Sequence, residues 1–138
     1  MIEQRQQDVV EEFSFFDDWM DRYQYIIELG KTLKPMDPDL KIESNLIKGC
    51  QSNVWLFANQ IEGKVEFVAD SDAILTKGII ALLVRVYSGA HPDEILRAKS
   101  DFIDQIGLKE HLSPNRANGL VSMIKQIKMY ALALSAKA

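Results

Sequence analysis

The sequence predicts one α+β domain, a small antiparallel sheet of about three strands packed with helices. The chain has 138 residues, of which 47% are hydrophobic, and this suits a single domain with one sizeable core. Two stretches of strand-forming residues lie in the middle of the chain, and helical periodicity flanks them on both sides. Such an arrangement is typical of an α+β domain, which we expect to span residues 1–138.

Two helices are expected before the strands. The first covers about 2–13, because apolar residues recur there on one helical face. Ser14, with Asp17 three residues later, resembles a capping box and predicts the start of the second helix. Gly30 suits the C′ position and predicts its end. Two prolines then predict a loop over 32–39.

The strand signal lies between residues 46 and 68. Residues 54–57 and 65–68 are rich in β-branched and aromatic side chains, which favour strands. Glu62 and Gly63 between them form a candidate tight turn, so the simplest arrangement is an antiparallel hairpin. Leu46 and Ile47 are expected to add a third, shorter strand.

A central helix is expected to follow the hairpin. Asp72 is the predicted N-cap of this helix, which runs from 73 to about 87 and is closed by Ser88 and Gly89. It is apolar nearly all round, so we expect it to be buried on most sides and to pack on the sheet. Three more helices are predicted: one opened by Pro92, one over 101–106, and a long one from Ser113 and Pro114 through Ala133 or beyond.

Composition excludes several classes of protein. The 16 basic and 20 acidic residues give a net charge of −4, which argues against a general nucleic-acid or anionic-membrane binder. The longest apolar run, 79–84, is far shorter than the ~20 residues of a membrane span. The N-terminus lacks the apolar stretch of a signal peptide, so a cytoplasmic protein is expected. A single cysteine and two distant histidines predict neither an internal disulfide nor a metal site.

Cys50 is the one candidate for chemistry. A lone cysteine is most often a small buried hydrophobic residue, but this one lies in a polar segment. Gly49 precedes it, and Gln51 and Ser52 follow it, just before the first strand. Such a loop can present a side chain to a partner. Lys48 is close enough in sequence to favour the thiolate, the nucleophilic form.

The residue inventory limits what Cys50 can do. A peroxide sensor usually has a resolving cysteine, and this chain has none. A cysteine hydrolase needs a general base, but His91 and His111 lie in no catalytic motif, and capping or packing is expected of both. The remaining chemistry for a loop thiolate is group carriage, in which it accepts a cargo from one protein and passes it to another.

Several ordered blocks of the sequence resemble the SufE family of sulfur-acceptor proteins. Together they cover nearly the whole chain, so the match is specific, although Asn53 stands where glutamine is more usual. The matching blocks are 16–19, 23–30, 45–52, 54–55, 69–73, 77–78, 80–81, 92–95 and 111–120.

This resemblance implies a function in iron–sulfur cluster assembly. Family members accept sulfur from a SufS-type cysteine desulfurase as a persulfide on the loop cysteine, here Cys50. They stimulate that enzyme and pass the sulfur to a SufBCD-type scaffold. The pyridoxal phosphate belongs to the desulfurase, so no cofactor is expected here, and the chain is a transfer partner rather than a stand-alone enzyme. The resemblance also implies a fold like that of IscU-type scaffold proteins.

The resemblance assigns expectations to residues around Cys50. Gly49, Gln51 and Ser52 match the loop that positions the cysteine, and the last two are either turn formers or partner contacts. We expect a resting Cys50 to lie partly among apolar side chains, and the loop to swing outward on docking.

Three further residues are expected to support the cysteine loop. Asp70 and Asp72 match a neighbouring loop that leads into the central helix. Arg116 matches a basic residue near the cysteine, and its place near a helix N-terminus, where cations are disfavoured, suggests an acidic, thiolate or persulfide partner.

Two alternatives to sulfur carriage have to be compared with it. The chain could regulate a cysteine desulfurase by docking alone, with Cys50 incidental. It could also be a metal-binding scaffold, but such scaffolds use several cysteines and this chain has one.

Overall fold

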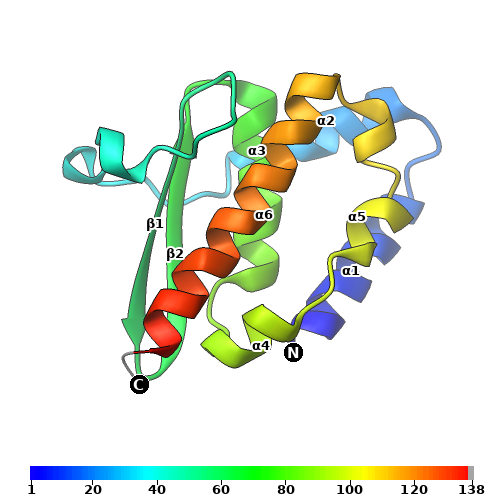
Figure 1. Ribbon diagram of the computed structural model, residues 1–138. Coiled ribbons are helices and arrows are strands. Elements are labelled where there is room, and N and C mark those ends of the chain that lie inside the picture. The colour runs from blue at the N-terminus through cyan, green and yellow to red at the C-terminus, as the bar shows by residue number, and fades with distance from the viewer. Residues whose placement is uncertain (137–138) are drawn as a thin grey trace.

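One antiparallel hairpin forms the sheet in the computed structural model, which describes residues 1–136 (Figure 1). Strand β1 (Val54–Ile61) pairs with β2 (Lys64–Ser71) along its whole length, from the pair Val54–Ser71 to the pair Ile61–Lys64. Glu62 and Gly63 join the strands with φ angles of 52° and 80°. Positive φ at both positions is the geometry of a two-residue type I′ turn, so the predicted hairpin is confirmed.

The expected third strand is wrong. Leu46 forms only an isolated bridge with Trp55, and the Ile47 N–H donates to the Val54 carbonyl at 2.8 Å. A 3₁₀-helix, η2 (Glu43–Asn45), ends immediately before this point, and Gly49 turns the chain away immediately after it. Only two residues therefore remain in position to extend the sheet.

Six α-helices accompany the hairpin within the described residues, and they lie on one side of it (Figure 1). The helices predicted around Pro92, over 101–106 and after Ser113 are all present, and the Ser113 side chain accepts a hydrogen bond from the Arg116 N–H as an N-cap. The bounds are α1 (Ile2–Ser14), α2 (Trp19–Gly30), α3 (Ile74–Tyr87), α4 (Pro92–Arg97), α5 (Asp101–Gln105) and α6 (Pro114–Ser135). Two further 3₁₀-helices are η1 (Pro38–Leu40) and η3 (Lys109–His111).

The second helix begins later than predicted. Asp18 is its N-cap and accepts a hydrogen bond from the Asp21 N–H at 2.9 Å. Ser14 instead ends α1, where its hydroxyl donates to the Glu11 carbonyl. Asp and Ser are comparable N-caps, and Asp18 has the extended backbone that a cap requires.

Helix α3 is the centre of the structure. It contacts β2 and α6 on one side and α2 and α1 on the other. Nine of its residues are buried, so the prediction of a helix enclosed on most sides is confirmed. Helix α6 crosses the same face of the sheet (Figure 1), where the Tyr130 hydroxyl donates to the Leu56 carbonyl at 2.9 Å.

Two glycines allow α2 and α3 to pack with their backbones in contact. A Cβ atom on Gly78 would lie 2.1 Å from the Ile26 carbonyl oxygen, and one on Gly30 would lie 3.1 Å from the Gly78 nitrogen. Gly30 is the last residue of α2, and the cap residue Lys31 keeps a right-handed φ of −72°. Gly30 is therefore needed for close packing and not for the left-handed C′ turn that its sequence position predicts.

Gly78→Ala is expected to lower the free energy of unfolding by about 2–3 kcal/mol, because the added methyl group overlaps the α2 backbone. The sign is diagnostic, since a glycine-to-alanine change inside an unhindered helix stabilises by about 0.5–1 kcal/mol. Urea denaturation followed by circular dichroism measures the change. Met20→Ala, at an exposed α2 position, is the control and should shift stability by no more than about 0.5 kcal/mol. Equal or greater stability of Gly78→Ala would contradict the packing argument.

Candidate functional site

The cysteine lies in a short loop, residues 48–53, whose two ends are fixed to the hairpin. The hydrogen bond from Ile47 to Val54 closes the loop at its base. At its far end, the Asn53 carbonyl accepts from the Ser71 hydroxyl at 2.8 Å and from the Asp72 N–H at 3.2 Å. The Asn53 N–H donates to the Asp72 carboxylate at 3.1 Å. The loop can therefore change conformation only between these anchors.

Asp72 does not cap the central helix, contrary to expectation. The N-cap of α3 is Ala73, which offers no side-chain hydrogen bond to the helix. Val54 and Ser71 form the last pair of the sheet. Asp72, which follows Ser71, therefore lies opposite Asn53, which precedes Val54. The Asp72 carboxylate consequently reaches Asn53 at the end of the cysteine loop. Asp72 supports the loop rather than the helix.

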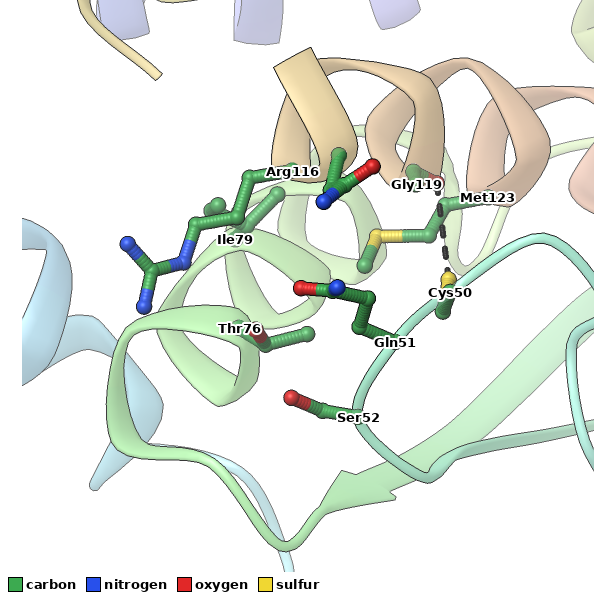
Figure 2. A pocket seen from close by; sticks show the side chains of 9 residues that line it. Cys50, Gln51, Ser52, Thr76, Ile79, Arg116, Gly119 and Met123 are labelled. Atoms are coloured by element: carbon green, nitrogen blue, oxygen red, sulfur yellow. Dashed lines mark hydrogen bonds between the residues drawn. The ribbon is translucent and has the colours of Figure 1, made fainter. Parts of the chain in front are cut away.

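The loop rests directly on α6, and a glycine on each side makes this approach possible. Gly49 has a φ of 93°, and a Cβ atom there would lie 2.5 Å from the Ser122 hydroxyl oxygen. Gly119 faces the cysteine, and a Cβ atom on it would lie 3.3 Å from Sγ of Cys50. Figure 2 shows the resulting contact, in which the Cys50 thiol donates to the Gly119 carbonyl at 3.7 Å.

Cys50 borders a small pocket of about 50 Å³ between the loop, α3 and α6. The space is enough for a few water-sized groups. In Figure 2 the Gln51 amide and the Met123 thioether both extend into it, from the loop and from α6 respectively. The lining residues are Cys50, Gln51, Ser52, Thr76, Ile79, Asn115, Arg116, Gly119 and Met123.

Arg116 lines the same pocket, so it lies near Cys50 as the sequence analysis expects. Its guanidinium group, however, extends past Ile79 and away from Sγ (Figure 2). Among residues 1–136 it forms no ion pair with a carboxylate. The acidic partner that its sequence position suggests is thus absent from the described part of the chain, and the cation is available to a group that enters from outside.

Asp70 lies apart from this pocket. Its carboxylate pairs with Lys41 at 2.6 Å and with Lys77 at 3.3 Å. Burial by itself would raise the pKa of Asp70, but hydrogen bonds from both ammonium groups and from a backbone N–H outweigh burial and hold that pKa below its usual range. Asp70 therefore ties the segment before the cysteine loop to β2 and α3.

The environment of Cys50 favours the thiol over the thiolate. The side chain is half-buried, and burial raises the pKa of the Cys50 thiol because the charged thiolate loses hydration. The effect of the neighbouring Lys48 that the sequence suggests does not reverse this direction. The thiol form can also donate to the Gly119 carbonyl, which the thiolate cannot do.

Sequence analysis missed the side chains that α3 and α6 contribute to the pocket, among them Thr76, Ile79 and Met123. Their apolar or small side chains fit the helical pattern of these segments, so the sequence indicates core residues at these positions. Gly119 is the exception that could have been found, because a glycine inside a helix costs about 1 kcal/mol relative to alanine and usually marks a close approach.

The described residues hold neither a cluster of metal ligands nor a membrane span. Over residues 1–136, no group of three or more His, Cys, Asp or Glu side chains is placed to hold a metal ion. None of the helices in this range combines the length and the apolar character needed to cross a membrane.

Cys50 should react more slowly with iodoacetamide in the folded chain than in the chain unfolded by urea, by at least several-fold at neutral pH. The reason is that the raised pKa leaves less thiolate at a given pH and burial restricts access. Because this is the only cysteine, mass spectrometry of the intact chain follows its alkylation directly. The rate should rise toward alkaline pH, with a midpoint above that of the unfolded chain. A midpoint below the unfolded value would contradict the description of a protonated resting thiol.

Comparison with known proteins gives consistent matches across the chain. Residues 7–131 match the family model SufE, described as an Fe-S metabolism associated domain. An uncharacterized SufE-like protein of Rhizobium meliloti is 41% identical over 128 residues, covering 89% of this chain and 91% of that protein. An uncharacterized SufE-like protein of Synechocystis is 40% identical over 125 residues, covering 91% and 79%.

Two further matches extend the comparison. SufE-like protein 1, chloroplastic/mitochondrial, of Arabidopsis thaliana is 41% identical over 132 residues, which is 95% of this chain and 36% of the longer plant protein. A solution structure of a hypothetical protein from Thermus thermophilus has the same fold, with a TM-score of 0.78, 22% identity and 94% of each chain covered. The family model and the relatives agree, and the chain belongs to the SufE family, which is associated with Fe–S metabolism.

Proposed function

We propose that this protein is a sulfur carrier in iron–sulfur cluster assembly, with Cys50 as the atom-carrying residue. In this proposal Cys50 accepts persulfide sulfur from a SufS-type cysteine desulfurase, and the removal of that sulfur stimulates the desulfurase. The sulfur then passes to a SufBCD-type scaffold. The desulfurase holds the pyridoxal phosphate, and the transfer takes place in the cytoplasm.

One observation carries the proposal: the only cysteine of the sequence sits on a loop that is anchored at both ends, and it borders a pocket lined by Arg116, which pairs with no carboxylate in residues 1–136. The loop allows the Cys50 side chain to approach a partner, and the packing of the loop on α6 protects the sulfur from solvent when no partner is bound. The described residues supply no second thiol, and neither histidine lines the pocket. These features suit a residue that receives a group from a partner's active site and needs no acid–base machinery of its own.

The transfer step follows thiol–disulfide exchange. The Cys50 sulfur attacks the terminal sulfur of the donor persulfide and forms a new S–S bond. The old S–S bond breaks, and the donor cysteine sulfur leaves with the electron pair. The proton lost from the Cys50 thiol balances the proton gained by the donor thiolate. The products are a Cys50 persulfide and a free donor thiol, so the step requires no external oxidant or reductant.

The loop must leave α6 for this attack to occur. In the resting state Sγ is held against the Gly119 carbonyl, and its pKa is raised by burial. Outward movement of residues 49–52 would break this contact and restore hydration, which favours the thiolate. The anchors at Ile47 and Asn53 confine the movement to the loop, and contacts with the partner would offset its cost.

Arg116 and Gln51 are the residues that would stabilise the persulfide carried by Cys50. A persulfide ionises more readily than a thiol, and a nearby cation would stabilise its anion. Arg116 borders the pocket and has no carboxylate partner in the described residues. The Gln51 amide extends into the same space and can donate hydrogen bonds to a terminal sulfur (Figure 2).

Incubation with a SufS-type desulfurase and cysteine, without reductant, should increase the mass of the intact chain by one sulfur atom. Dithiothreitol should remove the added mass, and Cys50→Ser should not gain it, because serine cannot form a persulfide. Mass spectrometry of the intact protein measures all three results. Full sulfur acceptance by Cys50→Ser would eliminate Cys50 as the carrier.

The same approach separates sulfur carriage from regulation by docking alone. If Cys50 is the carrier, Cys50→Ala should lose nearly all stimulation of cysteine turnover by the desulfurase. Gln51→Ala is a useful companion, because it keeps the thiol and should retain mass gain at a reduced rate. Full stimulation by Cys50→Ala, with no mass gain in the wild-type chain, would favour the docking regulator.

A further inference from the structure

Acidic residues are distributed very unevenly along this chain. All 20 lie outside residues 44–61 and 111–138, although these stretches make up a third of the sequence. The two stretches contain five basic residues, so they carry a formal charge of +5. The remaining residues, with eleven basic and twenty acidic side chains, carry −9. The net charge of −4 therefore hides a strong separation of charge.

The fold brings the two acid-free stretches together. The first contains the cysteine loop and β1, and the second contains α6. Gly49 lies against Ser122, Cys50 lies against Gly119, and Tyr130 bonds to Leu56. Figure 1 shows α6 running from the cysteine loop down along the hairpin. Within residues 1–136, the cysteine loop, β1 and α6 therefore lie together without an Asp or Glu side chain among them, and Cys50 is at one end of this region.

Exposed apolar side chains accompany the positive charge in this region. Val121, Met129 and Leu132 are 49%, 53% and 61% exposed. Together with Lys125 they recur at spacings of four, four and three residues, so they share one side of α6. A helix side with several exposed large apolar residues is unusual for a surface that meets only water. We call Lys48, Val121, Lys125, Met129 and Leu132 the α6 face.

A groove of about 440 Å³ connects this face to the cysteine loop. Lys48 stands on its loop side and Lys125 on its helix side, and neither pairs with a carboxylate within residues 1–136. Asn45, Ser122 and Gln126 add neutral polar groups. Glu43, the acidic residue nearest to this groove in sequence, does not line it but lines an adjoining hollow that Lys48 and Cys50 also border. Two unpaired lysines across a polar groove are suited to a carboxylate side chain of a partner.

We infer that the α6 face is the surface on which the sulfur-donating desulfurase docks, and that the donor presents acidic residues, flanked by apolar ones, beside its persulfide. This inference rests on the proposed function for the identity of the partner. Gly49, next to Cys50, lies against Ser122, which lines the same groove as Lys125, so a donor that reaches Cys50 along this groove would cover the face. Positive charge here would attract an acidic rim and raise the association rate. Val121 and Met129 would provide the apolar contacts that slow dissociation.

The test is a binding measurement in a chain that cannot move sulfur. Every variant carries Cys50→Ser, and its dissociation constant for a SufS-type desulfurase is measured by isothermal titration calorimetry. The test variant adds Lys125→Glu and Met129→Glu. The matched control adds Lys99→Glu and Met20→Glu, which make the same changes in the α4–α5 connection and on α2. Unchanged urea midpoints establish that both variants fold.

The test variant should bind at least about tenfold more weakly, and the control should bind within about twofold of the parent. Added salt should weaken the binding of the parent more than that of the test variant. The reason is that the parent keeps the positive charge of Lys125 in the interface, and salt screens its attraction to the acidic partner. Equal affinity of test variant and parent, or no binding by the parent, would overturn the inference.

Self-association is the competing use of this face, because the acidic remainder of a second copy could cover it. Sedimentation velocity of the parent chain distinguishes the two. A salt-sensitive dimer that disappears in the test variant, with desulfurase affinity unchanged, would overturn donor docking. Binding that depends on the α6 face while the wild-type chain gains no sulfur mass would instead overturn the role of Cys50 and leave the docking surface standing.

Discussion

The burial of helix α3 is the constraint on which the rest of the structure depends. Its large apolar side chains, including Ile80, Leu82 and Leu83, are completely removed from solvent, and each contributes roughly 1.5–3 kcal/mol. A helix that is apolar nearly all round must be enclosed on several sides. The sheet and α6 cover one side, and α2 can approach the other because Gly78 has no side chain. The pocket beside Cys50 forms where α3, α6 and the cysteine loop meet.

The site protects the Cys50 sulfur at the expense of its reactivity. The same contact that shields Sγ, the approach of Cys50 to Gly119, also lowers the thiolate fraction, since burial and a carbonyl acceptor both favour the thiol. Hydrogen bonds fix the loop at Ile47 and Asn53, while Cys50 itself is held by one weak thiol contact. Movement of the loop is therefore easiest at Cys50, between its two fixed ends. In the proposed function, the partner would restore the reactivity of Cys50 by drawing the loop outward.

Charge follows the same division. The protein carries excess acidic residues over most of its sequence, but in the described part of the chain the groove beside the cysteine loop is lined by no Asp or Glu. Excess negative charge elsewhere disfavours the approach of acidic surfaces in other orientations. Membership of the SufE family gives the general role in Fe–S metabolism, and the α6 face suggests how one partner is oriented on the sulfur. In our proposal, the family role, the cysteine loop and the α6 face all serve one sulfur transfer, at Cys50.

Local patterns in the sequence were enough to predict the α+β class, the hairpin with its Glu62–Gly63 turn, the buried α3 and the position of Cys50 in a polar loop. These features depend on local periodicity, turn chemistry and residue counts, which a linear chain displays. Tertiary structure alone decided that Asp72 holds Asn53 instead of capping α3, that Gly30 serves packing, and that Leu46 and Ile47 form no strand. It also brought Thr76, Ile79 and Met123 to the pocket beside the cysteine. Those outcomes depend on which segments meet from distant parts of the chain, and short-range patterns carry no information about such meetings.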